Sequence, residues 1–395
     1  MYIKRYLEEA VLETHKHFKV VYVGGPRQVG KTTLLQYLAK IENISYISLD
    51  DLNARQLAQS DPKLFIQSLS TPVFIDEVQY APDLFSYIKM RVDTEKKNGQ
   101  FWLSGSQHFS LMKGLKESLA GRVCILSLSG FSWAEEQGIA KSDEPFTPML
   151  HPHPLPASMT VSTLFERIFR GTFPAFLEDT SLPRDRFFGS YVQTYLDRDA
   201  RDIFGVEKMS AFQTFLGLVA ARTGQVLNVS ALARDAGISV HAANSWLHIL
   251  QASGIVYFLR PYFVNISKRL TKAPKLFFLD TGLAAYLMRW PDKESLQHGA
   301  MAGPLFETYV VSEVIKSYLY RGLEPSLYYL RSQDGHEVDL LIEHRRHLFP
   351  IEIKMTATPK EQDTAGIAYF RQVMPALEQG TVLCLAQEAL PINRT

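Results

Sequence analysis

The segment FKVVYVGGPRQVGKTTLLQYLAK, residues 18–40, constrains the fold more than any other, because it sets a glycine-rich turn between an apolar strand and a helix. In this P-loop pattern the glycines let backbone N–H groups face a phosphate, and the N-terminus of the following helix favours an anion. A turn that contains GKT by chance would not need these flanks. We therefore expect a phosphate to be bound by Gly25, Pro26, Arg27, Gln28, Val29, Gly30, Lys31, Thr32 and Thr33.

Two side chains of this loop and two carboxylates downstream suit nucleotide hydrolysis. Lys31 is expected to reach the β- and γ-phosphates, and the Thr32 hydroxyl to bind Mg²⁺. The apolar run PVFIDE, residues 72–77, ends in Asp76 and Glu77. We expect Asp76 to hold Mg²⁺ and Glu77 to orient or deprotonate the attacking water. An acidic pair at a strand end is also typical of a solvated turn, but the upstream P-loop favours the catalytic interpretation.

Five apolar strand candidates alternate with helical segments, which is typical of a parallel α/β sheet. They are residues 20–23, 44–49, 73–75, 101–103 and 123–128. An N-terminal helix is expected over residues 3–17. After the fourth strand, the polar residues SGSQ, 104–107, either sense the γ-phosphate or form a simple Ser/Gly turn. The pattern predicts an ATPase core from residue 18 to about residue 136.

Composition narrows the class of protein. A chain of 395 residues with 46% hydrophobic and 21% charged content is globular and long enough for several domains. No apolar run approaches the ~20 residues of a membrane span, and residues 1–9 lack the apolar core of a signal peptide, so we expect a cytoplasmic protein without membrane contact. A net charge of +1 gives no global argument for nucleic acid. Cys124 and Cys384 are too few and too far apart for a zinc site or a disulfide framework.

Downstream of the core, the sequence changes character twice. Residues 141–160 are rich in Pro, His and Ser and predict an exposed loop or linker, in which His151 and His153 are solvated rather than metal ligands. Residues 161–205 predict helices that form a lid on the nucleotide site. There Arg198 and Arg201 either contact a phosphate or a neighbouring subunit, or lie on a solvated helix face.

Residues 206–290 predict a winged helix. The run NVSALARDAGIS, residues 228–239, indicates a short helix, a glycine turn and a serine cap for a second helix. Strands at residues 255–259 and 275–279 would form the wing. Nine basic residues face only three acidic ones in this region, which suits phosphate contacts. The second helix has no Arg or Lys, so weak or shape-based DNA binding and a module that contacts only protein both stay open.

The last hundred residues contain a second set of charged positions. A helix over residues 306–314 carries Glu307 in its first turn. A hairpin would bring Asp339 of EVDLLI, residues 337–342, onto the same face as Glu352 and Lys354 of PIEIK. Such a set can bind Mg²⁺ and activate water for phosphodiester cleavage. The alternative is a salt bridge between Lys354 and one carboxylate on an open sheet face.

The motifs together resemble a known family. GPRQVGKTTLL, VFIDEVQYAPDLFSYIK, LSGSQ and SLAGR, with the C-terminal GPLFETYV, HEVDLLIE and IEIK, are similar to bacterial and archaeal AAA-type ATPases with a C-terminal domain of unknown function that resembles the PD-(D/E)XK nuclease fold. The resemblance implies ATP and Mg²⁺ as cofactors, a γ-phosphate sensor at Ser106, and an arginine finger at Arg122 that acts between the subunits of a homo-oligomer. It implies nuclease-like roles for Glu307, Asp339, Glu352 and Lys354, the three carboxylates as metal ligands.

We therefore expect a multidomain α/β protein. The expected parts are an ATPase core (1–140) with a parallel sheet, a loop or linker (141–160), a helical lid (161–205), a winged helix (206–290) and a nuclease-like α/β domain (300–395). One functional hypothesis is an ATP-driven protein that processes or regulates DNA, with metal-dependent cleavage. The other is a nucleotide-dependent switch or scaffold that binds protein partners and has an inert nuclease-like domain.

Overall fold

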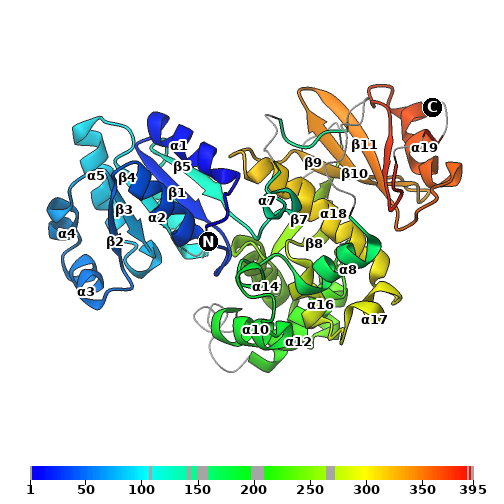
Figure 1. Cartoon of the computed structure of the whole chain (residues 1–395), viewed down its shortest axis with the longest axis horizontal. Coiled ribbons are helices and arrows are strands. Elements are labelled where there is room, and N and C mark those ends of the chain that lie inside the picture. Colours follow the sequence, from blue (N-terminus) through cyan, green and yellow to red (C-terminus); the bar gives the residue numbers. More distant parts are fainter. Residues whose placement is uncertain are drawn as a thin grey trace.

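The computed structural model describes residues 2–105, 109–139, 144–148, 159–196, 209–263, 272–388 and 391–392. Two sheets organise the chain, one in the N-terminal body and one in the remainder beside it (Figure 1). Within these ranges, no helix combines the length and the apolar character that crossing a bilayer requires. Four sequence-based predictions lie outside the described residues, namely those for Ser106, for His151 with His153, for Arg198 and for Arg201.

The first sheet is parallel, with strand order β2-β3-β4-β1-β5. Its strands are β1 (Val20–Gly24), β2 (Ser45–Ser48), β3 (Val73–Asp76), β4 (Phe101–Ser104) and β5 (Val123–Ser127). All five predicted strands are confirmed, with ends that differ by at most one residue. The helices that go with them are α1 (Leu7–His17), α2 (Lys31–Ile41), α3 (Leu52–Ser60), α4 (Pro62–Ser68), α5 (Leu84–Glu95), α6 (Phe109–Ser118) and α7 (Trp133–Glu136), with the short turn η1 (Val78–Tyr80).

Apolar residues on both faces of each central strand explain why this sheet is covered on both sides. Along β1, Val20 and Tyr22 join one buried cluster, while Val21 and Val23 join another. Because side chains alternate across a strand, an unbroken apolar run can be buried only between two layers. The layered arrangement leaves the carboxyl edge of the sheet, where β1 meets the P-loop, as the place for polar chemistry.

The second part begins with helices. These are α8 (Val161–Arg170), α9 (Ala175–Glu178), α10 (Arg184–Tyr191) with the π turn η2 (Val192–Leu196), α12 (Met209–Ala220), α13 (Val229–Asp235) and α14 (Val240–Ala252). The predicted serine cap is confirmed, since Ser239 accepts a hydrogen bond from the amide of Ala242 at the start of α14 (3.1 Å). Further along the chain lie α16 (Thr281–Leu287), α17 (Lys293–Gln297), α18 (Ala302–Leu319), η4 (Glu361–Thr364) and α19 (Ala365–Val373).

The strands of the expected wing and of the expected C-terminal domain form one sheet, with order β12-β11-β10-β9-β7-β8-β6. They are β6 (Gln225–Val226), β7 (Val256–Pro261), β8 (Lys275–Phe278), β9 (Leu327–Arg331), β10 (Glu337–His344), β11 (His347–Ile353) and β12 (Thr381–Leu383). The junction is a parallel pairing of β7 with β9, in which Arg260 lies opposite Tyr328. The two expected domains therefore share backbone hydrogen bonds.

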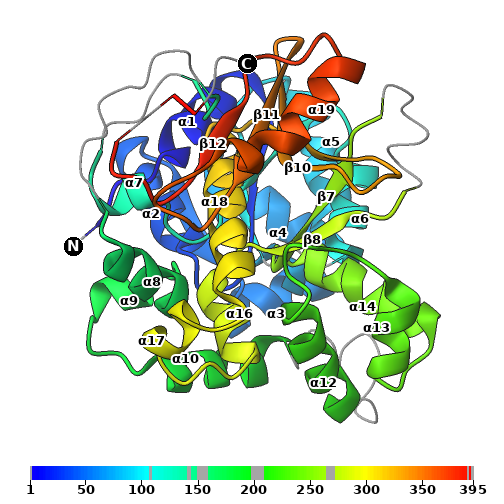
Figure 2. The same ribbon diagram turned by 90° about the vertical axis from the view of Figure 1, so that its right-hand side faces the viewer.

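Helix α18 lies in the middle of this second part, against β8, α8 and α16 (Figure 2). The sequence predicts an amphipathic helix over residues 306–314, and the structure differs in two ways. The helix is longer, and buried residues occur around most of its circumference, including Leu305, Phe306, Val311 and Val314. Such burial on several sides is typical of a central helix.

Of the expected linker, residues 141–160, the structure describes residues 144–148 and 159–160. There the amide of Phe146 donates to Ser317 Oγ (3.1 Å), and its carbonyl accepts from Tyr318 Oη (3.2 Å). Glu144 pairs with Arg345 (2.5 Å). This part of the stretch is attached to α18 and to the β10–β11 hairpin.

Candidate functional site

The P-loop has the backbone that an anion site needs. Gly25 has φ +146°, and a Cβ atom there would lie 1.9 Å from the carbonyl oxygen of Leu128, so no larger residue fits. Gln28 (φ 61°) and Gly30 (φ 91°) are left-handed, and α2 begins at Lys31. Left-handed residues in such a turn direct successive N–H groups into one concavity, which is continued by the helix N-terminus.

The ammonium group of Lys31 lies inside this loop. It donates to the carbonyl oxygens of Pro26 (2.7 Å) and Gly25 (3.1 Å). Burial lowers the pKa of Lys31 to about 8, although the Glu77 carboxylate opposes the shift. A phosphate bound by the loop would stabilise the charged form of this lysine.

Thr32 and Asp76 meet at the mouth of the loop. Thr32 Oγ1 donates to Asp76 Oδ2 (2.8 Å), and Ser104 Oγ donates to Asp76 Oδ1. Tyr46 Oη lies 3.5 Å from Oδ2 of the same carboxylate. Hydroxyl and carboxylate oxygens are the ligands that Mg²⁺ prefers. The two predicted magnesium ligands are therefore together and fit that ion.

Glu77 has an unusual backbone for its residue type, with φ 58° and ψ 42°. Such left-handed conformations are uncommon outside glycine and cluster at functional sites. Gln79 Nε2 donates to Glu77 Oε2 and holds the carboxylate. Gln79 was not among the residues predicted for the site. Its place in the turn directly after the acidic pair is the signal that was available.

Ser104, the last residue of β4, lies at this site, whereas the predicted sensor Ser106 lies outside the described residues. The strand-end motif SGSQ indicated the right location, and the contact with Asp76 identifies the first serine as a member of the site.

Arg122 lies at the amino end of β5, whereas the P-loop follows the carboxyl end of β1. Since the two strands are parallel, Arg122 and the P-loop of the same chain are at opposite edges of the sheet. Its guanidinium makes a two-pronged pair with Asp93, at 2.6 and 2.8 Å. Action on a neighbouring subunit stays a prediction, and it would require this pair to be broken or shared.

Arg5 binds the backbone of the P-loop through its side chain. This residue was not predicted from the sequence. Its guanidinium donates to the carbonyl oxygen of Val29 (3.0 Å), to that of Ser129 (2.9 Å) and to the carboxylate of Glu135 (3.0 Å). The side chain is buried, with the ring of Phe131 4.1 Å away. A single arginine before a helix carries no pattern that would reveal these contacts.

Polar contacts also join the segment after β5 to α18. The amide of Trp133 donates to Glu313 Oε2 (2.8 Å), and Lys316 Nζ donates to Glu313 Oε1 (2.9 Å) and to the carbonyl of Phe131 (3.1 Å). Arg167 of α8 donates to the same carbonyl (2.8 Å). These buried contacts attach the nucleotide-site edge of the core to the second part of the chain.

The C-terminal set of charged residues does come together. Lys354 Nζ donates to Glu352 Oε2 (2.7 Å) and to Asp339 Oδ2 (3.0 Å), and the amide of Ile353 donates to the same Asp339 oxygen (2.9 Å). Burial raises the pKa of Glu352 to about 8, with Asp339 adding to the shift. Burial likewise raises the pKa of Glu307 to about 7 against the opposing charge of Lys275.

Lys275 was predicted to be one of the basic residues of the wing that contact phosphates, and the structure corrects this prediction. It is buried, and its Nζ contacts Glu337 Oε1 (2.5 Å) and Glu307 Oε1 (3.1 Å). Glu337 was also missed, although strand alternation places it on the same face as Asp339. No group of three or more acidic, His or Cys side chains in the described ranges is arranged to hold a metal ion. As they stand, Glu307, Asp339 and Glu352 do not fit the predicted metal site.

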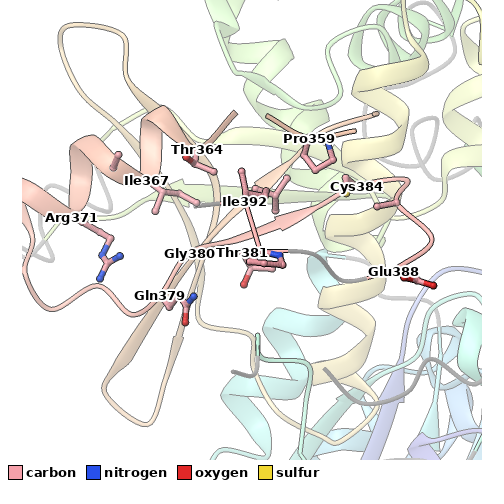
Figure 3. Close-up of a pocket in the computed structure, with 14 residues that line it drawn as sticks. Pro359, Thr364, Ile367, Arg371, Gln379, Gly380, Thr381, Cys384, Glu388 and Ile392 are labelled. Atoms are coloured by element: carbon pink, nitrogen blue, oxygen red, sulfur yellow. The ribbon is translucent and has the colours of Figure 1, made fainter. Parts of the chain in front are cut away.

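A hollow near the C-terminus is separate from both charged sites. It has a volume of about 240 Å³ and lies beside β12 and α19, with Arg371, Thr381, Cys384 and Glu388 in its lining (Figure 3). No residue of the P-loop site or of the C-terminal charged set lines it.

Comparisons with known proteins match three successive parts of the chain. Family models match an AAA domain at residues 17–136, Domain of unknown function (DUF8612) at residues 161–294 and Domain of unknown function (DUF4143) at residues 302–395. Among solved structures, the Walker-type ATPase of Pyrococcus abyssi has 14% identity and a TM-score of 0.45, and covers 71% of this chain and 94% of its own. AMPPCP-bound DnaA from Aquifex aeolicus has 13% identity and a TM-score of 0.30, and covers 62% and 85%.

Two sequence relatives are closer. Uncharacterized proteins of Mycobacterium tuberculosis and Mycobacterium bovis are each 31% identical to this chain over 342 residues, which cover 86% of this chain and 71% of theirs. The chain therefore belongs to the family of these two mycobacterial proteins, as a member that carries an AAA domain followed by two domains of unknown function.

Proposed function

We propose that the protein binds ATP with Mg²⁺ and hydrolyses it. The observation that carries this proposal is the hydrogen bond of Thr32 to Asp76 at the mouth of a P-loop that holds the Lys31 ammonium. Mg²⁺ held by Thr32 and Asp76 would supply positive charge to the phosphates during transfer. Lys31 would orient the β- and γ-phosphates, and the carboxylate of Glu77 would accept a proton from the attacking water.

Measuring MgATP binding and phosphate release tests this proposal. Lys31→Ala should abolish binding, because it removes the ammonium group from the loop. Thr32→Val keeps the shape of the side chain and removes the hydroxyl, so it should lower the dependence of binding on Mg²⁺. A parent protein that binds no ATP, or a Lys31→Ala variant that binds it normally, would refute the proposal.

We further propose that the nucleotide state controls what the winged-helix region contacts. The support is a direct approach between the two regions. At Gly254, in the turn after α14, a Cβ atom would lie 3.0 Å from Cδ of Pro26 in the P-loop. A change in the loop on nucleotide binding would therefore reach the end of α14. In this proposal ATP acts as a ligand that shifts the position of that helix.

DNA is the partner that we propose for this region. Arg234 and Lys272 are exposed there and suit phosphate contacts, although Arg234 lies 3.5 Å from Asp235. Arg222 is paired more closely with Asp235 (2.5 Å), and Lys275 is buried. So few exposed cations among the described residues of this region imply modest, non-specific affinity. The test is binding of duplex DNA across a range of salt, with and without ATP. A slope of log affinity against log salt concentration that is shallower in the Arg234→Ala and Lys272→Ala variants than in the parent supports DNA as the partner. The absence of DNA binding at low salt favours a protein partner.

A further inference from the structure

A lysine from one region is inserted into a group of carboxylates from the next. Lys275 is the first residue of β8, and its side chain is only 4% exposed. Its Nζ lies 2.5 Å from Glu337 Oε1, 3.1 Å from Glu307 Oε1 and 3.8 Å from Asp339 Oδ1. One ammonium group thus faces three carboxylates, which come from α18 and β10.

The sheet explains how this lysine reaches the carboxylates. β7 lies between β8 and β9, and β9 pairs in turn with β10. The long side chains of Lys275 and Glu337 meet beside the ring of Tyr329 on β9, whose centre is 5.7 Å from Nζ. A shorter side chain at position 275 could not make the contact.

The remaining oxygens of the cluster are also enclosed. Lys354 takes the other oxygen of Asp339, at 3.0 Å. A Cβ atom at Gly224 would lie 3.4 Å from Glu307 Oε2, and one at Gly366 would lie 2.7 Å from Glu352 Oε1. Backbone therefore approaches the cluster from two sides, and the buried ammonium group of Lys275 and the partly exposed one of Lys354 lie among its oxygens.

Buried carboxylates repel one another unless a cation lies among them. Mg²⁺ would need oxygen ligands at about 2.0–2.1 Å. An ammonium group at hydrogen-bonding distance from the same oxygens fills that space, so the lysine and the metal exclude each other.

We propose that Lys275 is the built-in cation of this carboxylate cluster, that it excludes divalent metal from the cluster, and that it fastens the last hundred residues to the β7–β8 pair. This role is independent of ATP hydrolysis. Its direct consequence is that replacing the ammonium group by a neutral side chain of similar length creates a Mn²⁺ or Mg²⁺ site where the parent has none.

The experiment uses the full chain in a Lys31→Ala background, so that metal at the P-loop does not contribute. Mn²⁺ binding is measured by calorimetry, and the thermal midpoint is measured with EDTA and with Mn²⁺. In EDTA, Lys275→Met should lower the midpoint by roughly 5 °C or more, because it strands buried carboxylates. Mn²⁺ should restore part of this loss in Lys275→Met and leave the parent unchanged. Adding Asp339→Asn should abolish the Mn²⁺ effect.

Two results would overturn the proposal. One is Mn²⁺ binding by the Lys31→Ala parent that disappears in Lys31→Ala/Asp339→Asn, a measurement that does not depend on any variant of Lys275. The other is a folded Lys275→Met variant that gains no Mn²⁺ site. Lys275→Met/Glu307→Gln is the matched control, because removing one charge of each sign should raise the midpoint above that of Lys275→Met and weaken its Mn²⁺ binding.

Discussion

ATP affinity should fall as the pH rises from 7 to 9, because the phosphates require the ammonium form of Lys31. In the free protein this lysine loses its proton more readily than an ordinary lysine does. Burial lowers the pKa of this lysine to about 8. Phosphate oxygens favour the ammonium form, so the pKa is higher in the complex. At pH 7 the lysine is charged in both states and binding involves no protonation. Above pH 8 the free protein must take up a proton to bind, and this uptake weakens affinity.

The magnitude follows from the fraction of free protein that carries the proton. At pH 9, one unit above the pKa, about one molecule in ten is protonated, so the apparent Kd should be about tenfold higher than at pH 7. Nearly one proton should be taken up for each ATP bound. The uptake should diminish again only above the pKa of Lys31 in the complex.

Titration calorimetry at pH 7, 8 and 9, in two buffers with different ionisation enthalpies, measures both the affinity and the proton uptake. Lys31→Arg is the control, because a guanidinium group stays charged over this range and should give affinity without this pH dependence. An affinity for the parent that is constant from pH 7 to 9, with no proton uptake, would refute the reasoning.

Three substitutions test the other assignments. Glu77→Gln should retain ATP and lose turnover, by about 100-fold or more if the carboxylate accepts the water proton, as measured by phosphate release at saturating ATP. Equal turnover would remove that role. Arg122→Ala should lower turnover and leave ATP binding unchanged. If Arg122 acts between subunits, mixing this variant with Lys31→Ala should restore activity. Without such complementation, Arg122 has only a structural role within its own chain. Arg5→Ala should lower the free energy of unfolding by about 3–5 kcal/mol and raise KM. If Arg5 positions the P-loop, the double variant Arg5→Ala/Glu135→Gln should regain stability while its KM stays raised. Recovery of both would assign Arg5 a purely structural role.

The contacts of α18 bear on how the parts of the chain communicate. Glu313 and Lys316 bind the segment that follows β5, while Glu307, nearer the start of the same helix, binds Lys275. The nucleotide-site edge and the carboxylate cluster are therefore attached to one rigid element. A shift of α18 would alter the surroundings of both, which is the physical requirement for coupling between two sites.

Local patterns determined the parts of the protein that depend on neighbours in sequence. The strand, glycine turn and helix of the P-loop were predicted because backbone freedom and apolar periodicity act over a few residues. The cap at Ser239 was predicted for the same reason, since its hydrogen bond spans three positions. The acidic pair at Asp76 could be assigned because a parallel sheet brings its carboxyl strand ends to one edge.

Only the tertiary structure decided where isolated charges would go. Arg5 finds Glu135 at a separation of 130 positions, and no short-range pattern encodes such a partner. Lys275 belongs to a segment whose basic composition is typical of a DNA-binding wing. The parallel pairing of β7 with β9 brings its side chain among carboxylates instead. A charge is stabilised by whatever surrounds it in three dimensions, and for these two residues the surroundings are assembled from distant segments of the chain.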